Sequence, residues 1–167
     1  NGINFVRPNV GLYEFNGSKS NNIVWRKGAS GHNFTPFKDP NPAAPADQRY
    51  KAVAGLHATG LFALGSPDGV RWRKLGDRPI ITSKRFAFDS QNVAFWSQPE
   101  RCYALYFRSW KQAPGKPGMG FRWVSRSTSP DFARWSEPVE MDMGDAPLEH
   151  IYTQQTHPYF RAPHLFI

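Results

Sequence analysis

Short apolar blocks alternate with polar and turn-forming residues along the whole chain, and no block follows a helical repeat. Gly, Pro, Asn and Asp bound the blocks. This pattern is typical of half-buried β-strands joined by tight turns. It predicts strands at residues 12–15, 22–25, 33–37, 50–54, 61–64, 93–96, 103–109, 121–127, 135–141 and 159–167. The sequence therefore predicts an all-β fold.

Turn signals separate these blocks. Asn16-Gly17 lies between two apolar blocks, and both residue types tolerate the positive φ of a two-residue hairpin turn. Residues 28–48 are rich in Gly and Pro, and residues 111–120 form an insertion that we expect to be a mobile hairpin loop.

One unit recurs along the chain. Residues 68–72 read Asp-Gly-Val-Arg-Trp, and 63 positions later residues 131–135 read Asp-Phe-Ala-Arg-Trp. Residues 1–5 resemble the end of the same unit. A repeat of this length built only of strands is expected for a four-stranded propeller blade with a long loop.

The repeat predicts a β-propeller with four segments. Residues 1–27 would end one blade, 28–82 and 83–145 would be complete blades, and 146–167 would begin the next. A propeller ring needs at least four blades, so we expect the chain to be an internal fragment of one propeller domain.

Composition and charge narrow the functional classes. Aromatic residues make up 15% of the chain, with 15 Pro and 14 Gly, as in all-β proteins. No apolar run is long enough to span a membrane. The net charge is +8, but Lys and Arg are scattered, which argues against a nucleic-acid partner and leaves acidic polysaccharides open. Cys102 lies in a strand pattern and is expected to be a buried small hydrophobe.

Three motifs resemble those of the five-bladed β-propeller glycoside hydrolases of families 32 and 43, which include β-fructosidases and arabinanases. They are Asp39-Pro40, residues 88–92 (Phe-Asp-Ser-Gln-Asn) and residues 66–72 (Ser-Pro-Asp-Gly-Val-Arg-Trp). The resemblance implies five blades whose innermost strands bring three acids to a central funnel. It implies an Asp as nucleophile or base, an Asp that stabilises the transition state, and a Glu as general acid.

Asp39 and Asp89 are the catalytic candidates, because each opens a predicted blade. Glycosidic cleavage needs a proton donor and a base or nucleophile on opposite sides of the bond. Asp39 could instead form an Asp-Pro turn, and Asp89 could cap a turn through backbone N–H groups. The third acid is missing near residues 160–164, and Glu149 lies too early in the unit to match. The general acid would lie beyond Ile167, be replaced by another group, or have been lost.

Further polar and aromatic residues are candidates for sugar binding. We expect the polar ones to line the funnel and bind hydroxyls or an acidic group: His32, Asn33, Asn92, Arg161 and His164. Trp110 and Trp123 flank the insertion and could stack on sugar rings. The five His residues lack zinc-site spacing, so no metal or redox cofactor is expected.

The leading hypothesis is a glycoside hydrolase that cleaves a neutral or anionic polysaccharide or oligosaccharide, which would favour a secreted or periplasmic location. One alternative is a sialidase-like propeller, since residues 66–72 are one residue short of the Ser-x-Asp-x-Gly-x-x-Trp box. Another is a non-catalytic propeller that binds glycan or protein.

Overall fold

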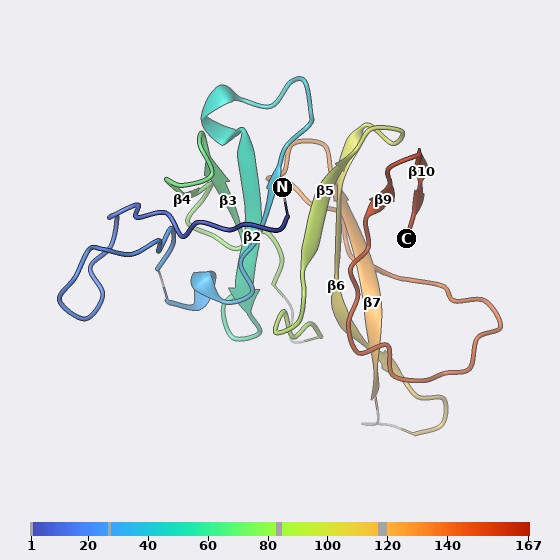
Figure 1. Ribbon diagram of the computed structural model, residues 1–167. Coiled ribbons are helices and arrows are strands. Elements are labelled where there is room, and N and C mark those ends of the chain that lie inside the picture. Colours follow the sequence, from blue (N-terminus) through green and yellow to red (C-terminus); the bar gives the residue numbers. More distant parts are fainter. Residues whose placement is uncertain (1, 27, 83–84, 117–119) are drawn as a thin grey trace.

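The computed structural model describes residues 2–26, 28–82, 85–116 and 120–167, and shows an all-β chain (Figure 1). Two four-stranded antiparallel sheets and one two-stranded hairpin account for the strands, and none of them closes into a barrel. The predicted all-β class is confirmed. Two short 3-10 helices, η1 (Gly28–Gly31) and η2 (Ala46–Gln48), flank the first strand.

Each four-stranded sheet is a simple meander. Sheet 1 contains β1 (Thr35–Lys38), β2 (Tyr50–Leu56), β3 (Gly60–Ser66) and β4 (Arg73–Lys74) in that order. Sheet 2 contains β5 (Val93–Ser97), β6 (Cys102–Gln112), β7 (Gly120–Ser129) and β8 (Val139–Glu140). The sheets fall inside the sequence units 28–82 and 83–145, respectively.

Sheets 1 and 2 pack against each other through alternating side chains. Val53, Leu61 and Ala63 of sheet 1 form one buried cluster with residues of sheet 2 that include Leu105 and Phe107. The opposite face of sheet 2 carries a second cluster that packs against the last part of the chain. Successive side chains of a strand point to opposite faces of the sheet. Neighbouring residues of an apolar block therefore pack into different clusters. Burying one such Leu or Phe contributes about 1.5–3 kcal/mol.

The recurring Asp turn has the same geometry in both sheets. Asp68 Oδ1 accepts hydrogen bonds from the backbone N of Val70 (2.9 Å) and of Arg71 (2.7 Å). Asp131 Oδ1 accepts them from Ala133 (3.0 Å) and Arg134 (2.8 Å). The turn also needs a left-handed residue, which is Gly69 (φ 75°) in the first copy and Phe132 (φ 65°) in the second. Both acids therefore form turns of the same kind.

Several strands differ from their predicted bounds. Residues 12–15 and 22–25 form no strand, and the block 135–141 contains only the two-residue strand β8. The block 159–167 is a hairpin, because a turn at residues 160–161 separates β9 (Pro158–Tyr159) from β10 (Ala162–Phe166). The Asn16-Gly17 turn is confirmed, with φ values of 50° and 76° and two hydrogen bonds between Phe15 and Ser18.

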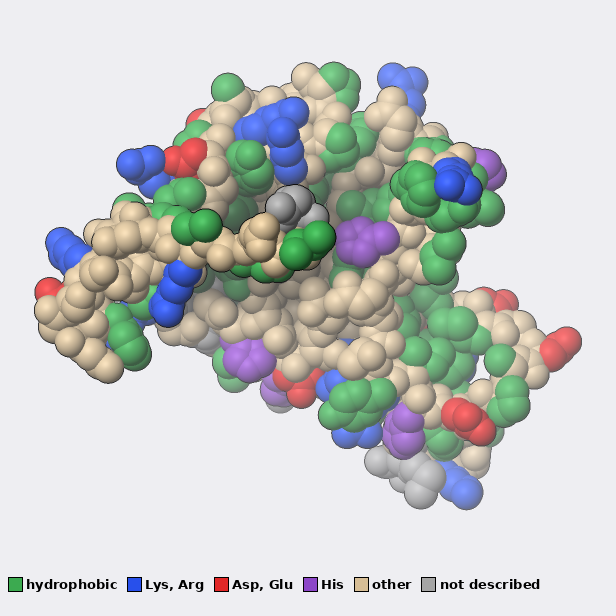
Figure 2. All heavy atoms as spheres, viewed as in Figure 1, with side chains coloured by type: hydrophobic (Ala, Val, Ile, Leu, Met, Phe, Trp, Pro, Cys, Tyr) green, Lys and Arg blue, Asp and Glu red, His purple; other side chains and the backbone are tan. Residues whose placement is uncertain are grey.

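Two expectations concern the chain as a whole. Within the described residues no helix has the length and hydrophobicity needed to cross a membrane. The Lys and Arg side chains on the face shown in Figure 2 are scattered rather than gathered into one patch.

Cys102 is half-buried in β6 rather than fully buried, and burial raises the pKa of its thiol.

The Asp turn makes stability dependent on pH. Burial raises the pKa of Asp131, but the backbone N–H groups of Arg134 and Ala133 outweigh burial and lower it from 3.8 to about 2. A group whose native pKa is depressed stabilises the fold above its unfolded pKa, and that stabilisation is lost as pH falls through the native value. We expect the advantage of wild type over Asp131→Asn in the free energy of unfolding to be full above about pH 5. It should shrink towards zero between about pH 4 and pH 2, as measured by urea denaturation. An advantage that stays constant over this range would contradict the assignment.

Candidate functional site

The two predicted catalytic acids lie at opposite ends of the packed sheets. Asp39 follows the last residue of β1, whereas Asp89 precedes the first residue of β5. Two contacts show that β1 and β5 run in the same direction. At the start of both strands, Asn33 hydrogen-bonds Phe88. At the end of both strands, Asp39 hydrogen-bonds Tyr103, which pairs with Trp96 of β5. Asp39 is six residues beyond Asn33, which is roughly 20 Å of extended chain. The structure does not bring Asp39 and Asp89 together.

Asp39 is fully buried in an ion pair. Its Oδ2 lies 2.6 Å from Nζ of Lys51, and the two side chains are 0% and 1% exposed. The same Oδ2 accepts the hydroxyl of Tyr103 at 2.7 Å, and Oδ1 accepts the backbone N of Asn41 at 2.9 Å. A carboxylate with these partners has no free lone pair facing solvent. The assignment of Asp39 as a catalytic acid is therefore corrected to that of a structural ion-pair residue.

This buried network joins the two sheets. Lys51 belongs to β2 of sheet 1 and Tyr103 to β6 of sheet 2. Asn41 Nδ2 donates to the Tyr103 hydroxyl at 3.0 Å, which closes a loop of three polar side chains around Asp39. Burial, reinforced by the hydrogen bond to Asp39, raises the pKa of Tyr103 far above its ordinary value. Tyr103 therefore stays a neutral donor to the carboxylate.

Asp89 is accessible and is oriented by a buried arginine. Its side chain is 51% exposed, and Oδ1 lies 2.9 Å from Nη1 of Arg108, which is 8% exposed. The other terminal nitrogen of Arg108 donates to the backbone oxygen of Tyr152 at 3.0 Å. A half-exposed carboxylate on a fixed cation can contact a ligand while its own position is held. Of the two predicted acids, only Asp89 has this arrangement.

The backbone before Asp89 is held in a conformation that few residues adopt. Phe88 has φ 52° and is fully buried against Phe86 and Phe107. Its carbonyl oxygen accepts Nδ2 of Asn33 at 2.9 Å and Nδ2 of Asn92 at 3.1 Å. Left-handed backbone in a buried aromatic residue persists only where the surroundings enforce it. The two amides and the aromatic cluster enforce it here, and they aim Asp89 outwards.

Asn33 and Asn92, both predicted to bind sugar, therefore use their side-chain amides to hydrogen-bond the backbone of Phe88. Asn92 is 0% exposed, so its assignment as a substrate ligand is corrected to a structural role. Asn33 is partly exposed at the Asp89 end of the sheets, as is the preceding residue His32, whose backbone oxygen accepts the backbone N of Gly55. Asn33 and His32 therefore share the end of the molecule where Asp89 is exposed.

The other two predicted ligands lie elsewhere. Residues 152–159 run along β5, because Gln154 hydrogen-bonds Gln91 at its start and His157 stacks on Phe95 near its end. Arg161 follows in the β9–β10 turn and therefore lies at the end opposite Asp89. His164 is exposed within β10. Neither residue is brought to Asp89.

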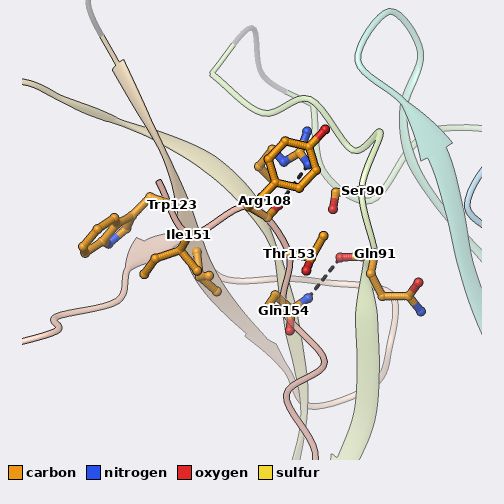
Figure 3. A pocket seen from close by; sticks show the side chains of 9 residues that line it. Ser90, Gln91, Arg108, Trp123, Ile151, Thr153 and Gln154 are labelled. Carbon is orange, nitrogen blue, oxygen red and sulfur yellow. Dashed lines mark hydrogen bonds between the residues drawn. The ribbon is translucent and has the colours of Figure 1, made fainter. Parts of the chain in front are cut away.

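Residues 149–154 form a segment, here called the crossing segment, that runs across the Asp89 end of sheet 2. The backbone N of Ile151 donates to the oxygen of Arg122 in β7 at 2.8 Å, and Nε2 of Gln154 donates to the oxygens of Gln91 and Tyr106 at 3.0 Å each. Figure 3 shows Ile151, Thr153 and Gln154 of this segment close to Arg108 and Gln91. The guanidinium carbon of Arg108 lies 4.8 Å from the centre of the Tyr152 ring. The crevice beneath the crossing segment has no room for a water molecule. A ligand would therefore bind on its outer rim rather than inside it.

Sequence reasoning undervalued Glu149, which begins this crossing segment. Glu149 is exposed and directly precedes His150, whose Nδ1 accepts the backbone N of Arg122. It therefore lies on the β7 side of the same end at which Asp89 lies on the β5 side. Ile151 bonds β7 on the side that faces β8, so three strand spacings separate this segment from β5, which is roughly 14 Å. The sequence alone could not predict that Asp89 and Glu149 share this end, because the contacts between their segments are made by Arg108 and Tyr152.

The two tryptophans proposed for stacking have different fates. Trp123 is 3% exposed, and its indole nitrogen donates to the oxygen of Met141 at 2.7 Å, so its assignment as a sugar-stacking residue is wrong. Trp110 is 38% exposed and faces the guanidinium of Arg122 at 5.2 Å. Only Trp110 can offer a ring face to a ligand.

Among the described residues, no group of three or more His, Cys, Asp and Glu side chains could hold a metal ion. No protein-family model, curated protein or solved structure matches this chain.

The role of Asp39 can be tested by breaking the pair with Lys51. Removing one partner leaves a buried charge uncompensated, so we expect Asp39→Asn to lower the free energy of unfolding by about 3–5 kcal/mol in urea denaturation. Asp39→Asn combined with Lys51→Met should recover most of that loss, because no charge is then buried.

The exposed pair between Asp47 and Arg73 supplies the control for this test. Asp47→Asn should change the free energy of unfolding by about 1 kcal/mol or less. A loss of that small size for Asp39→Asn, or additive losses in the double variant, would show that the buried pair is not structural.

Proposed function

We propose that this chain is part of a β-propeller glycoside hydrolase, with sheets 1 and 2 as neighbouring blades and the β9–β10 hairpin in a third. Three features support this proposal: each sheet is a four-stranded meander, β1 and β5 run in the same direction, and the Asp turn recurs at the same place in both sheets. The proposed ring would have five blades, by resemblance to the family 32 and 43 enzymes.

The contact between Asp89 and Arg108 is the observation that carries the enzymatic proposal. Arg108 connects the exposed carboxylate of Asp89 to Tyr152, three residues after Glu149. Two exposed acids from different loops thus lie at one end of sheet 2. Three strand spacings put their backbones roughly 14 Å apart, so both side chains would extend towards each other to flank one glycosidic bond.

The surroundings of the two acids suggest different roles. Asp89 is held by the guanidinium of Arg108, which fixes the position of its carboxyl group. It would act as the base that takes a proton from water, or as the nucleophile. Glu149 has no ion pair within the described residues and would donate a proton to the leaving oxygen. Cleavage then breaks the bond between the anomeric carbon and that oxygen, and water supplies the new hydroxyl.

The proposed substrate is an oligosaccharide or polysaccharide, and this chemistry requires no redox cofactor. His32 reaches the same end from sheet 1 and would contact sugar hydroxyls. A polysaccharide substrate favours a secreted or periplasmic location for the enzyme. A glycan-binding propeller without hydrolytic activity is the alternative, favoured by the exposed ring of Trp110.

Replacing the acids tests the enzymatic proposal. Carboxylate acid–base catalysis contributes about 10²–10⁴-fold, so Asp89→Asn and Glu149→Gln should each lower kcat by at least that factor. The assay measures reducing-sugar release from a panel of polysaccharides and nitrophenyl glycosides by the protein that carries this chain. The melting temperature should change little for Glu149→Gln, whose side chain is exposed. It is measured for Asp89→Asn as well, because that variant removes the charge paired with the buried Arg108 and a loss of fold must be separated from a loss of activity.

Asp142→Asn is the matched control, because Asp142 is also an exposed acid but lies in the loop after β8. It should keep full activity. Wild-type activity in Asp89→Asn would overturn the site. No hydrolysis of any substrate by wild type, together with retained glycan binding, would favour the non-catalytic alternative.

A further inference from the structure

Arg122 is held between two exposed aromatic rings at the Asp89 end of sheet 2. Its guanidinium carbon lies 5.2 Å from the centre of the Trp110 ring and 4.9 Å from that of Tyr152. Trp110 is directly opposite Arg122 in the β6–β7 ladder, and Tyr152 reaches it from the crossing segment. The rings are 38% and 60% exposed. The cation therefore lies within cation–π distance of two accessible rings.

The charge of Arg122 has no acidic partner among the described residues. Three arginines lie along this part of β6 and β7, and the other two are neutralised: Arg108 by Asp89 and Arg126 by Glu100. The Nε of Arg122 is buried without a hydrogen-bond partner. Stacking on rings fixes a guanidinium but leaves its in-plane N–H donors unused.

A guanidinium with free donors in a fixed plane matches an anion with two or three oxygens. Such a fork binds a carboxylate or sulfate through paired, charge-assisted hydrogen bonds. The rings beside it can pack against the apolar faces of sugars. The chain's net charge of +8 adds a long-range attraction for an acidic polymer.

We propose that Arg122, Trp110 and Tyr152 form a subsite for an acidic sugar, which binds the carboxylate of a uronic acid or the sulfate of a sulfated residue. That the ligand is a glycan rests on the proposed function, whereas the anion preference follows from Arg122 itself. Arg108 links the subsite to Asp89, since its guanidinium also faces the Tyr152 ring, at 4.8 Å. An acidic residue bound here would sit beside the bond to be cleaved.

Affinity electrophoresis tests this subsite without requiring turnover. The protein that carries this chain is run through gels that contain polygalacturonate, carrageenan or neutral arabinan, which separates carboxylate from sulfate recognition. We expect retention by at least one anionic polymer and weaker retention by arabinan. Arg122→Gln should raise the dissociation constant for that polymer by about tenfold or more. Arg122→Lys, which keeps the charge without the fork, should fall between.

Arg78→Gln is the control, because it removes the same charge from an exposed position in the loop after β4. Circular dichroism and the melting temperature show whether each variant is folded. Equal retention of Arg122→Gln and Arg78→Gln would overturn the subsite and indicate attraction by net charge alone. If Arg122→Gln does not fold, Arg122→Lys is used in its place. A dissociation constant for Arg122→Lys equal to that of wild type would also overturn the subsite.

The two proposals fail in different ways. Loss of retention in Arg122→Gln, without hydrolysis by wild type, would support the subsite and contradict the enzymatic proposal. Hydrolysis that requires Asp89, without preference for an anionic polymer, would support the enzyme and contradict the subsite.

Discussion

The buried ion pair between Asp39 and Lys51 determines how the two sheets meet. Both charges are removed from solvent, so each depends on the other and on the Tyr103 hydroxyl from the facing sheet. Such a pair is costly to break and tolerates little displacement. At the Asp39 end of the packed sheets, the polar groups therefore stabilise the contact between the sheets. The opposite end, where Asp89 is exposed, is then the end at which polar groups can act on a ligand.

Local patterns predicted the secondary structure well. The alternating blocks predicted the long strands, because side-chain alternation depends on residues close in sequence. The blocks at 12–15, 22–25 and 159–167 were assigned wrongly. The first two form no strand, and the third bends at residues 160–161 to pair with itself. Partner strands are set by tertiary contacts, which local alternation does not encode.

The site was predicted less well, for a physical reason. Asp39 and Asp89 look equivalent in sequence, but their positions at opposite ends of parallel strands separate them. One signal was present: Lys51 lies inside an otherwise apolar strand, and a buried lysine demands a carboxylate. Arg108, Arg122 and Glu149 gave no comparable signal. Their neighbourhood exists only because residues 150–154 cross sheet 2 and place Tyr152 between the two arginines.

We propose that the Asp89 end of the packed sheets binds ligand and that the Asp39 end is structural. Carbodiimide labelling of carboxylates in the native protein, detected by mass spectrometry with and without polygalacturonate, distinguishes the two ends. We expect Asp89 and Glu149 to be labelled and to become protected by the polymer, while Asp39 reacts only after unfolding. Labelling of native Asp39 that the polymer suppresses, with Asp89 unaffected, would contradict it.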